Sequence, residues 1–159
     1  MKKKSLENQA AKQTAGTLFV CATPLGNLED ISLRVIKSLK SVDIIAAEDT
    51  RVTQNLLQHF QIKKTLVSYF DFNKKLSAEK IIKELLTGKN IALVTDAGTP
   101  GIADPGYLLI KQAIARSIKI TPLPGASAVI TALCISGLPT DKFIFEGFLP
   151  RKEKALEKT

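Results

Sequence analysis

The segment DAGTPGIADPG, residues 96–106, holds three glycines, two prolines and two aspartates in eleven positions, directly after the apolar run IALVT. Glycine permits backbone conformations and close ligand approaches that a Cβ would forbid, whereas proline fixes φ and removes a donor. The composition therefore predicts a shaped loop. An ordinary strand-to-helix connection is one interpretation, but the density of glycine and proline favours a loop that cradles a ligand.

Short apolar runs alternate with helical patterns on both sides of this segment. Near-continuous apolar strands joined by helices predict a five-stranded, mainly parallel sheet covered on both faces, which is an α/β fold. Ser77 and Gly88 are placed to cap the start and the end of the third helix. The predicted strands cover residues 17–23, 42–47, 65–69, 91–95 and 118–123, and the helices between them cover residues 29–40, 50–60, 77–88 and 105–117.

The sequence changes character after the fifth predicted strand. Residues 122–137 predict a helix behind a proline-braced turn, and KFIFEGF, residues 142–148, is typical of a further strand. Residues 17–124 are therefore expected to form an N-terminal α/β domain. Residues 125–159 are expected to be a linker helix and the first strand of an incomplete second α/β domain, with a charged helical extension as the competing interpretation. Residues 1–16 are expected to be a basic, disordered tail.

Composition restricts the class of protein. The chain has 159 residues, of which 45% are hydrophobic, so it can bury one good core. No apolar stretch approaches the roughly 20 residues that cross a bilayer, so we expect a cytoplasmic protein with no membrane partner. Cys21 and Cys134 lie far apart among apolar neighbours, and the chain has a single histidine. This pattern predicts two buried thiols in a reducing compartment and no metal site.

The net charge of +8 is concentrated partly at the two ends of the chain. Residues 1–16 hold four lysines and one glutamate, and residues 150–159 hold four basic and two acidic residues. Basic tails attract nucleic acid by releasing its counterions, but solvated ends without a partner explain the same pattern. Charge by itself therefore supports an RNA partner only weakly.

A polar or glycine-rich loop follows each of the five predicted strands. The carboxyl ends of the strands in a doubly wound sheet meet at one edge, where ligands bind, so we expect these loops to form a single pocket. The usual dinucleotide and P-loop signatures, GxGxxG after the first strand and GxxxxGK[ST], are both absent. The pocket is therefore expected to suit a ligand less anionic than a triphosphate.

Five motifs carry a resemblance: TPLGNLEDISLR (23–34), AAEDTR (46–51), DAGTPGIADPG (96–106), PLPGASA (122–128) and GLPTDKFIFEGFLPRK (137–152). In this order and spacing they resemble the ribosomal small-subunit methyltransferase I family, whose members are similar in fold to tetrapyrrole methylases. The resemblance implies S-adenosylmethionine as cofactor, 2′-O-methylation of a cytidine in the decoding region of 16S rRNA, and a cytoplasmic homodimer. It also implies a cofactor held between two domains, so we expect the 159-residue chain alone to bind it weakly.

The matched motifs supply the candidate site residues. Glu48 and Asp49 are candidates for the base that takes the hydroxyl proton, and Arg51 either binds a phosphate or pairs with Glu48; an ion-paired helix start is the alternative. Asp96 binds the cofactor or caps its own loop, and Asp104 is a candidate N-cap. The cofactor-binding residues that the resemblance implies are Pro24, Gly26, Asp96, Gly98, Thr99, Pro100, Gly101, Ile102, Ala103, Asp104, Ser127 and Ala128.

Three positions depart from the pattern that is usual in the family. Ala103 stands where a serine commonly precedes DPG, YFDFN (69–73) stands where histidines are common, and Ala126 replaces a second proline. Two alternative functions stay open: a tetrapyrrole or other small-molecule methylase of the same fold, and a non-catalytic interaction module. The AAEDTR motif and the motif at residues 137–152 favour the ribosomal family.

Overall fold

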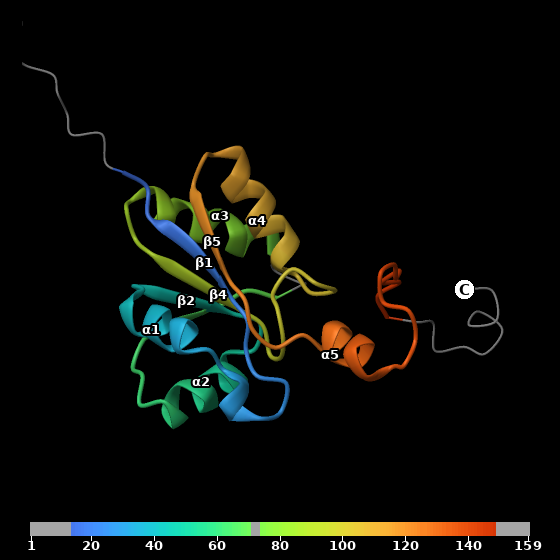
Figure 1. Cartoon of the computed structure of the whole chain (residues 1–159). Coiled ribbons are helices and arrows are strands. Elements are labelled where there is room, and N and C mark those ends of the chain that lie inside the picture. Colours follow the sequence, from blue (N-terminus) through green and yellow to red (C-terminus); the bar gives the residue numbers. More distant parts are fainter. Residues whose placement is uncertain (1–13, 71–73, 149–159) are drawn as a thin grey trace, which may run out of the picture.

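Five strands form a single parallel sheet at the centre of the molecule (Figure 1). The structure, a computed structural model, describes residues 14–70 and 74–148. The order across the sheet is β3-β2-β4-β1-β5, and every pair of neighbouring strands is parallel, which confirms the predicted α/β fold. The strands are β1 (Thr17–Cys21), β2 (Ile44–Ala47), β3 (Thr65–Ser68), β4 (Ile91–Val94) and β5 (Lys119–Leu123).

Helices cover both faces of this sheet (Figure 1). One face is covered by α1 (Leu33–Ser41) and α2 (Thr50–His59), and the other by α3 (Lys74–Leu86) and α4 (Gly106–Ala115). A 3₁₀ turn, η1 (Leu28–Asp30), precedes α1, and α5 (Ala128–Ile135) follows β5. The side chains of Ser32, Asp49 and Ser127 accept a hydrogen bond from the first turn of α1, α2 and α5, as N-cap residues do.

Alternate residues of the central strands supply the two cores, because successive side chains of a strand point to opposite faces. In β4, Ile91 and Leu93 join the core under α3 and α4, whereas Ala92 and Val94 join the core under α1 and α2. Strands β1 and β2 alternate in the same way. The sheet is therefore buried on both sides, which is why the strand segments are nearly continuous apolar runs.

Some predicted boundaries differ from the structure. Helix α3 begins at Lys74, so Ser77 lies inside the helix and is not its N-cap. Gly88 follows the end of this helix as predicted, with φ at +90°. The expected strand at residues 142–148 is not formed. No strand among the described residues lies beside this segment, so its backbone groups have no ladder to join.

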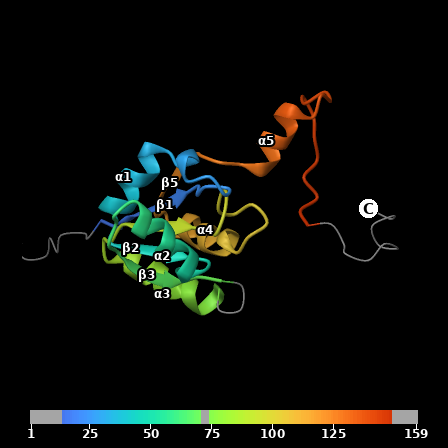
Figure 2. The same ribbon diagram turned by 90° about the horizontal axis from the view of Figure 1, so that it is seen from below.

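Helix α5 and residues 136–148 stand apart from the sheet and its four covering helices (Figure 2). None of the residues of α5 is buried, so the prediction of a buried Cys134 is wrong: the side chain is exposed because its helix projects from the domain. Cys21 is buried as predicted, and burial raises the pKa of its thiol to about 12. The large apolar side chains exposed along this segment are Ile130, Ile135, Leu138, Phe143, Ile144, Phe145 and Phe148.

Two further expectations concern the ends of the chain and membrane association. Residues 1–13 of the expected basic tail, and residues 149–159, lie outside the described residues. Among the helices that the structure describes, none is long and apolar enough to cross a membrane.

A single tyrosine hydroxyl ties the end of β3 to the start of α4, and its removal tests the packing of this side of the fold. Tyr69 is 1% exposed; its hydroxyl donates to the Pro105 carbonyl at 2.9 Å and accepts from the Leu109 amide at 3.1 Å. We expect Tyr69→Phe to lower the free energy of unfolding by about 1–3 kcal/mol, because both buried groups lose this partner. Urea unfolding followed by circular dichroism measures the change.

Tyr107 provides the matched control, since it is 65% exposed on α4. Tyr107→Phe is expected to change the free energy of unfolding by less than about 0.5 kcal/mol. Equal effects of the two substitutions would show that the Tyr69 hydroxyl does not stabilise the junction of β3 and α4.

Candidate functional site

The loops after β1 and β4 diverge at the carboxyl edge of the sheet. These two strands are neighbours, but the chain after β1 continues to α1 on one face and the chain after β4 continues to α4 on the other. In parallel α/β sheets ligands bind in the crevice that such a change of direction opens. The structure therefore brings DAGTPGIADPG to the place where the topology favours a ligand.

The diverging loops are joined by a short antiparallel bridge between Thr23 and Gly98. The Thr23 amide donates to the Gly98 carbonyl at 2.8 Å, and the Gly98 amide donates to the Thr23 carbonyl at 3.1 Å. The Thr23 hydroxyl donates to the Thr95 carbonyl at 3.0 Å. Thr23 is only 2% exposed, so these contacts fix the relative positions of the two loops.

The β4 loop, residues 95–105, also contacts the loops that follow the other three strands. Toward β5, the Thr99 hydroxyl donates to the Ala126 carbonyl at 3.2 Å. Toward β3, Tyr69 makes the contacts with Pro105 and α4 described above. Toward β2, Glu48 Oε2 accepts from the Thr95 hydroxyl and from the Asp96 amide. The five loops thus meet at one edge, but among the described residues the pocket at this edge is lined only by the β1 loop, α2 and the start of the β4 loop, so the predicted single pocket of all five loops is not what forms.

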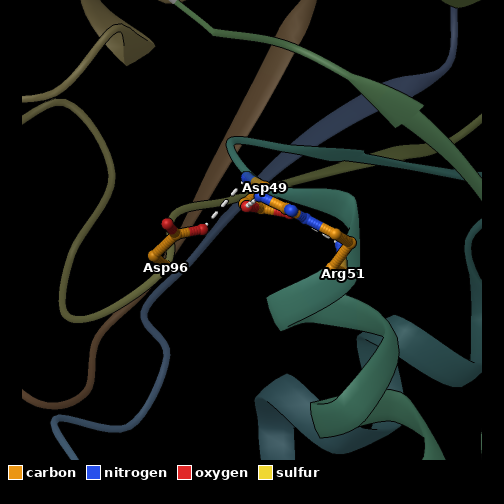
Figure 3. A network of polar contacts seen from close by, with 3 residues as sticks. All are labelled: Asp49, Arg51 and Asp96. Atoms are coloured by element: carbon orange, nitrogen blue, oxygen red, sulfur yellow. Dashed lines mark hydrogen bonds and ion pairs between the residues drawn. The ribbon is translucent and has the colours of Figure 1, made fainter.

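Acidic side chains dominate the junction of the β2 and β4 loops (Figure 3). Asp96 Oδ1 accepts from the Asp49 amide at 3.0 Å. The Asp49 carboxylate accepts from the Arg51 amide at 2.8 Å and from Arg51 Nη2 at 2.6 Å. Arg51 therefore pairs with Asp49, and the expected alternative of a pair with Glu48 is not what forms. Asp49 is the N-cap of α2, and its carboxylate accepts from the Arg51 amide, which places it within reach of the Arg51 guanidinium.

These contacts shift the protonation of the carboxylates in different directions. The Arg51 guanidinium lowers the pKa of Asp49 to about 2, and Asp49 raises the pKa of Arg51. Burial raises the pKa of Asp96, and repulsion from Glu48 and Asp49 adds to the effect. The edge of the sheet thus combines one carboxyl group whose pKa is lowered with one whose pKa is raised.

The backbone of the β4 loop adopts conformations that explain its glycines. Gly98 and Gly101 have φ values of +83° and +89°, a region that side chains with a Cβ rarely adopt. A Cβ on Gly98 would lie 3.3 Å from the side chain of Leu25. Ala103 also has a positive φ, +58°, which is a strained conformation for a residue with a Cβ. The loop is therefore shaped by its backbone, as its composition predicts.

Asp104 holds the second half of this loop together. Its Oδ1 accepts from the Gly101 amide at 2.6 Å and from the Gly106 amide at 2.9 Å. The N-cap of α4 is Pro105 and not Asp104 as predicted, but the bond to Gly106 lets the Asp104 side chain satisfy the first amide of the helix. Burial raises the pKa of Asp104.

A pocket of about 290 Å³ opens beside the β4 loop, between the β1 loop and α2. Of the residues predicted from sequence, Pro24, Gly26 and Asp96 line it. Glu48, Asp49 and Arg51 lie next to it through the contacts of Asp96. The Thr99 hydroxyl connects the β4 loop to the segment before α5 through the Ala126 carbonyl. The remaining predicted residues lie along this loop and at the start of α5: Gly98, Thr99, Pro100, Gly101, Ile102, Ala103, Asp104, Ser127 and Ala128.

Sequence reasoning missed several residues that build this site. Thr23 and Thr95 connect the loops, Tyr69 anchors the loop's far end, and Asn55 lines the pocket from α2. Thr23 stands at the end of a strand in a recognised motif, so its position carried a signal. Asn55 is one polar residue on an amphipathic helix, and nothing in the sequence separates it from its exposed neighbours. Among the described residues, no group of three or more acidic, histidine or cysteine side chains is arranged to hold a metal ion.

Comparison with known proteins identifies relatives over nearly the whole chain. The sequence profile of the Tetrapyrrole (Corrin/Porphyrin) Methylases matches residues 17–158. A protein of Halalkalibacterium halodurans named "Ribosomal RNA small subunit methyltransferase I" is 51% identical over 160 aligned positions, covering 98% of this chain and 55% of that protein. A protein of the same name from Escherichia coli O157:H7 is 50% identical, covering 93% of this chain and 52% of its own length. The chain spans about half the length of these relatives.

Solved structures agree with the fold. A uroporphyrin-III-C-methyltransferase from Thermus thermophilus superposes with a TM-score of 0.59 at 19% identity, covering 78% of this chain and 54% of that one. At this identity the similarity establishes the fold alone.

Removing the Asp104 carboxylate tests whether it shapes the β4 loop. We expect Asp104→Ala to lower the free energy of unfolding by about 1–3 kcal/mol, because the Gly101 and Gly106 amides lose their acceptor. Asp104→Asn keeps a side-chain oxygen and is expected to lose less. Thermal and urea unfolding of both variants measure the difference, and an alanine variant as stable as the asparagine variant would contradict this role.

The pH dependence of stability gives a second test of the Asp104 side chain. Because burial raises the Asp104 pKa, the folded protein holds this proton more tightly than the unfolded chain. The stability contributed by this group is therefore fully present below the ordinary pKa of an aspartate and falls as pH rises through the higher folded pKa. The stability of the native protein relative to Asp104→Asn is expected to decrease as pH rises through that window.

Proposed function

The chain belongs to the tetrapyrrole methylase family, and from that premise we propose that it forms part of an S-adenosylmethionine-dependent rRNA methyltransferase. The acceptor we propose is the ribose 2′-hydroxyl of a cytidine in the decoding region of 16S rRNA. Relatives that are about 50% identical carry names that specify ribosomal RNA, which supports an rRNA substrate. A cytoplasmic homodimer acting on the small ribosomal subunit is part of the same proposal.

The geometry of the β4 loop fits the proposed cofactor. Gly98 and Gly101 have positive φ, and a Cβ on either would lie 3.3 Å from a neighbouring side chain, Leu25 or Ile110, so these glycines let the loop adopt its shape and pack closely. S-adenosylmethionine supplies, when bound, an electrophilic methyl group on a positively charged sulfur. Carboxylates outnumber cations around the loop, with Glu48, Asp96 and Asp104 close to it and Arg51 already paired. That balance favours a cationic ligand over a phosphate-rich one.

The residues beside the loop divide into holding and proton-accepting roles. Asp49 has a pKa of about 2 and is paired with Arg51, so it is a weak proton acceptor at neutral pH. We therefore assign Asp49 the role of fixing Arg51 and the start of α2. Glu48 remains the candidate base, and the Thr95 hydroxyl and the Asp96 amide orient its carboxylate. Arg51 is 88% exposed in its side chain and is the candidate contact for an RNA phosphate.

The observation that carries the proposal is that one loop is hydrogen-bonded to the loops after all four other strands. Such a preorganised edge positions two reactants, and positioning supplies a large part of the rate of a group transfer. We propose that a second wall completes the site, since this chain spans about half of its relatives and residues 128–148 expose a series of apolar side chains.

A methyl-transfer assay tests the function directly. The protein expressed from its gene is incubated with labelled S-adenosylmethionine and 30S subunits that lack the modification. We expect label in the 2′-O position of a cytidine of 16S rRNA, and no turnover by the 159-residue chain alone, because one wall excludes water incompletely. A parallel reaction contains a tetrapyrrole precursor. Transfer to the tetrapyrrole and not to the ribosomal subunit would refute the proposal in favour of a small-molecule methylase.

A pair of glycine variants tests the cofactor cradle. Gly98 and Gly88 both have positive φ, +83° and +90°, but Gly88 lies at the end of α3, away from the site. We expect valine at either position to lower stability by about 1–3 kcal/mol. Only Gly98→Val is expected to weaken S-adenosylmethionine binding by the protein expressed from its gene, by about tenfold or more, because its side chain would displace Leu25 and distort the β4 loop. Calorimetry measures the affinity, and equal affinities of the two variants would remove Gly98 from the site.

A further inference from the structure

The pocket beside the β4 loop is lined by both apolar and polar residues, and residues 98–101 of that loop do not line it. Leu28 of η1 and Val52 of α2 line it and remain 38% and 42% exposed, so the described chain leaves these apolar walls uncovered. Asn55 of α2 and Asp96 of the β4 loop add polar groups to the same lining. A pocket with apolar walls and a few convergent polar groups is the usual form of a small-ligand site.

We propose that this pocket holds the base of the acceptor nucleotide, and that the side chains of Asn55 and Asp96 read its amino-bearing edge. The inference rests on the function proposed above and specifies where the acceptor lies in the same site.

The size of the pocket favours a single base. Its volume of about 290 Å³ lies just below the range of pockets that enclose drug-sized ligands. Side chains that recognise single-stranded RNA bind bases splayed out of the helix, hold their faces against apolar or aromatic groups and read their polar edges. Leu28 and Val52 supply such apolar walls here.

The two polar side chains distinguish bases by donors and acceptors. Asn55 offers an amide with one acceptor oxygen and an NH₂ donor, whereas an ionised Asp96 only accepts. Cytosine presents an exocyclic amino donor, and acidic side chains accept from this group in known nucleic-acid interfaces. Uracil presents a carbonyl oxygen at the same place, which the Asp96 carboxylate would repel. The lining therefore favours cytosine over uracil.

The orientation of Asp96 is fixed by the neighbouring loop. Its Oδ1 accepts from the Asp49 amide at 3.0 Å, and its other oxygen points away from Asp49 (Figure 3). This second oxygen is the one we assign to the amino group of the base. The backbone of the same residue continues into the cradle, so its side chain serves the acceptor pocket while its main chain belongs to the cofactor loop.

The pocket and the cradle share a wall. Thr23 lines the pocket, and its amide donates to the Gly98 carbonyl in the cradle at 2.8 Å. A base held in the pocket therefore places its ribose near the Gly98 end of the β4 loop. Arg51 precedes Val52 on α2 and exposes most of its side chain, which suits a phosphate flanking the bound nucleotide.

Nucleotide binding to this chain tests the proposal without relying on activity. The ¹⁵N-labelled 159-residue chain is titrated with cytidine 5′-monophosphate and with uridine 5′-monophosphate, and amide shifts are followed by NMR. We expect the amides of Val52, Asn55 and Asp96 to shift, with about tenfold tighter binding of the cytidine nucleotide. An absence of shifts at these amides with either nucleotide would overturn the proposal.

Two variants with matched controls test the roles of the two polar side chains. Asp96→Asn keeps an oxygen for the Asp49 amide but replaces the second oxygen by a donor, so the preference for the cytidine nucleotide should be lost. Asn55→Ala should weaken binding of both nucleotides severalfold. Gln54→Ala, on the same helix and outside the pocket lining, and Asp141→Asn, on the exposed segment after α5, should change neither value.

Measurements on the protein expressed from its gene separate this inference from the proposed function. If the native protein transfers no methyl group to the ribosomal subunit, the proposed function fails, whatever the nucleotide titration gives. If it does, Asp96→Asn should reduce the discrimination between subunits with cytidine and uridine at the acceptor position, with S-adenosylmethionine affinity measured alongside. Unchanged discrimination in an active Asp96→Asn enzyme would leave the function intact and overturn the assignment of the pocket.

Discussion

The position of one loop governs the rest of this structure. The β4 loop, residues 95–105, is hydrogen-bonded to the loops that follow β1, β2, β3 and β5 through Thr23, Glu48, Tyr69 and Ala126. Parallel strands make this possible because all five carboxyl ends lie at one edge of the sheet. The hydrogen bonds between the loops and the two cores beneath the sheet edge fix the shape of this surface.

The charges at this edge follow from the same arrangement. The backbone of β2 turns into α2 at Asp49, and the capping requirement of the helix places a carboxylate there beside the β4 loop. Arg51 compensates Asp49, whereas Asp96 and Asp104 stay without a cationic partner among the described side chains and have raised pKa values. The β4 loop therefore carries two carboxyl groups without a cationic partner, and the largely exposed Arg51 side chain lies beside it at the start of α2.

Much of the fold and part of the site could be predicted from the sequence. Apolar runs of four or five residues separated by helical patterns define the strands of a buried parallel sheet, because such strands contact helices on both faces. Gly98 and Gly101 indicated a shaped loop, and both have positive φ. One boundary was predicted wrongly: Ser77 has the chemistry of an N-cap, but α3 begins at Lys74, because N-cap chemistry is a local preference that does not by itself fix where a helix begins.

By itself, the sequence determined the α/β class, the edge where the loops gather and the family, because these depend on periodicity and on contiguous motifs. Only the tertiary structure decided that Thr23 bridges to Gly98, that Arg51 pairs with Asp49 and not with Glu48, and that Asn55 and Asp96 line one pocket. It also decided that Cys134 is exposed and that residues 142–148 form no strand. The physical reason is that burial and long-range hydrogen bonds depend on which segments pack together, and residues 75 positions apart, such as Thr23 and Gly98, meet only once the sheet has assembled.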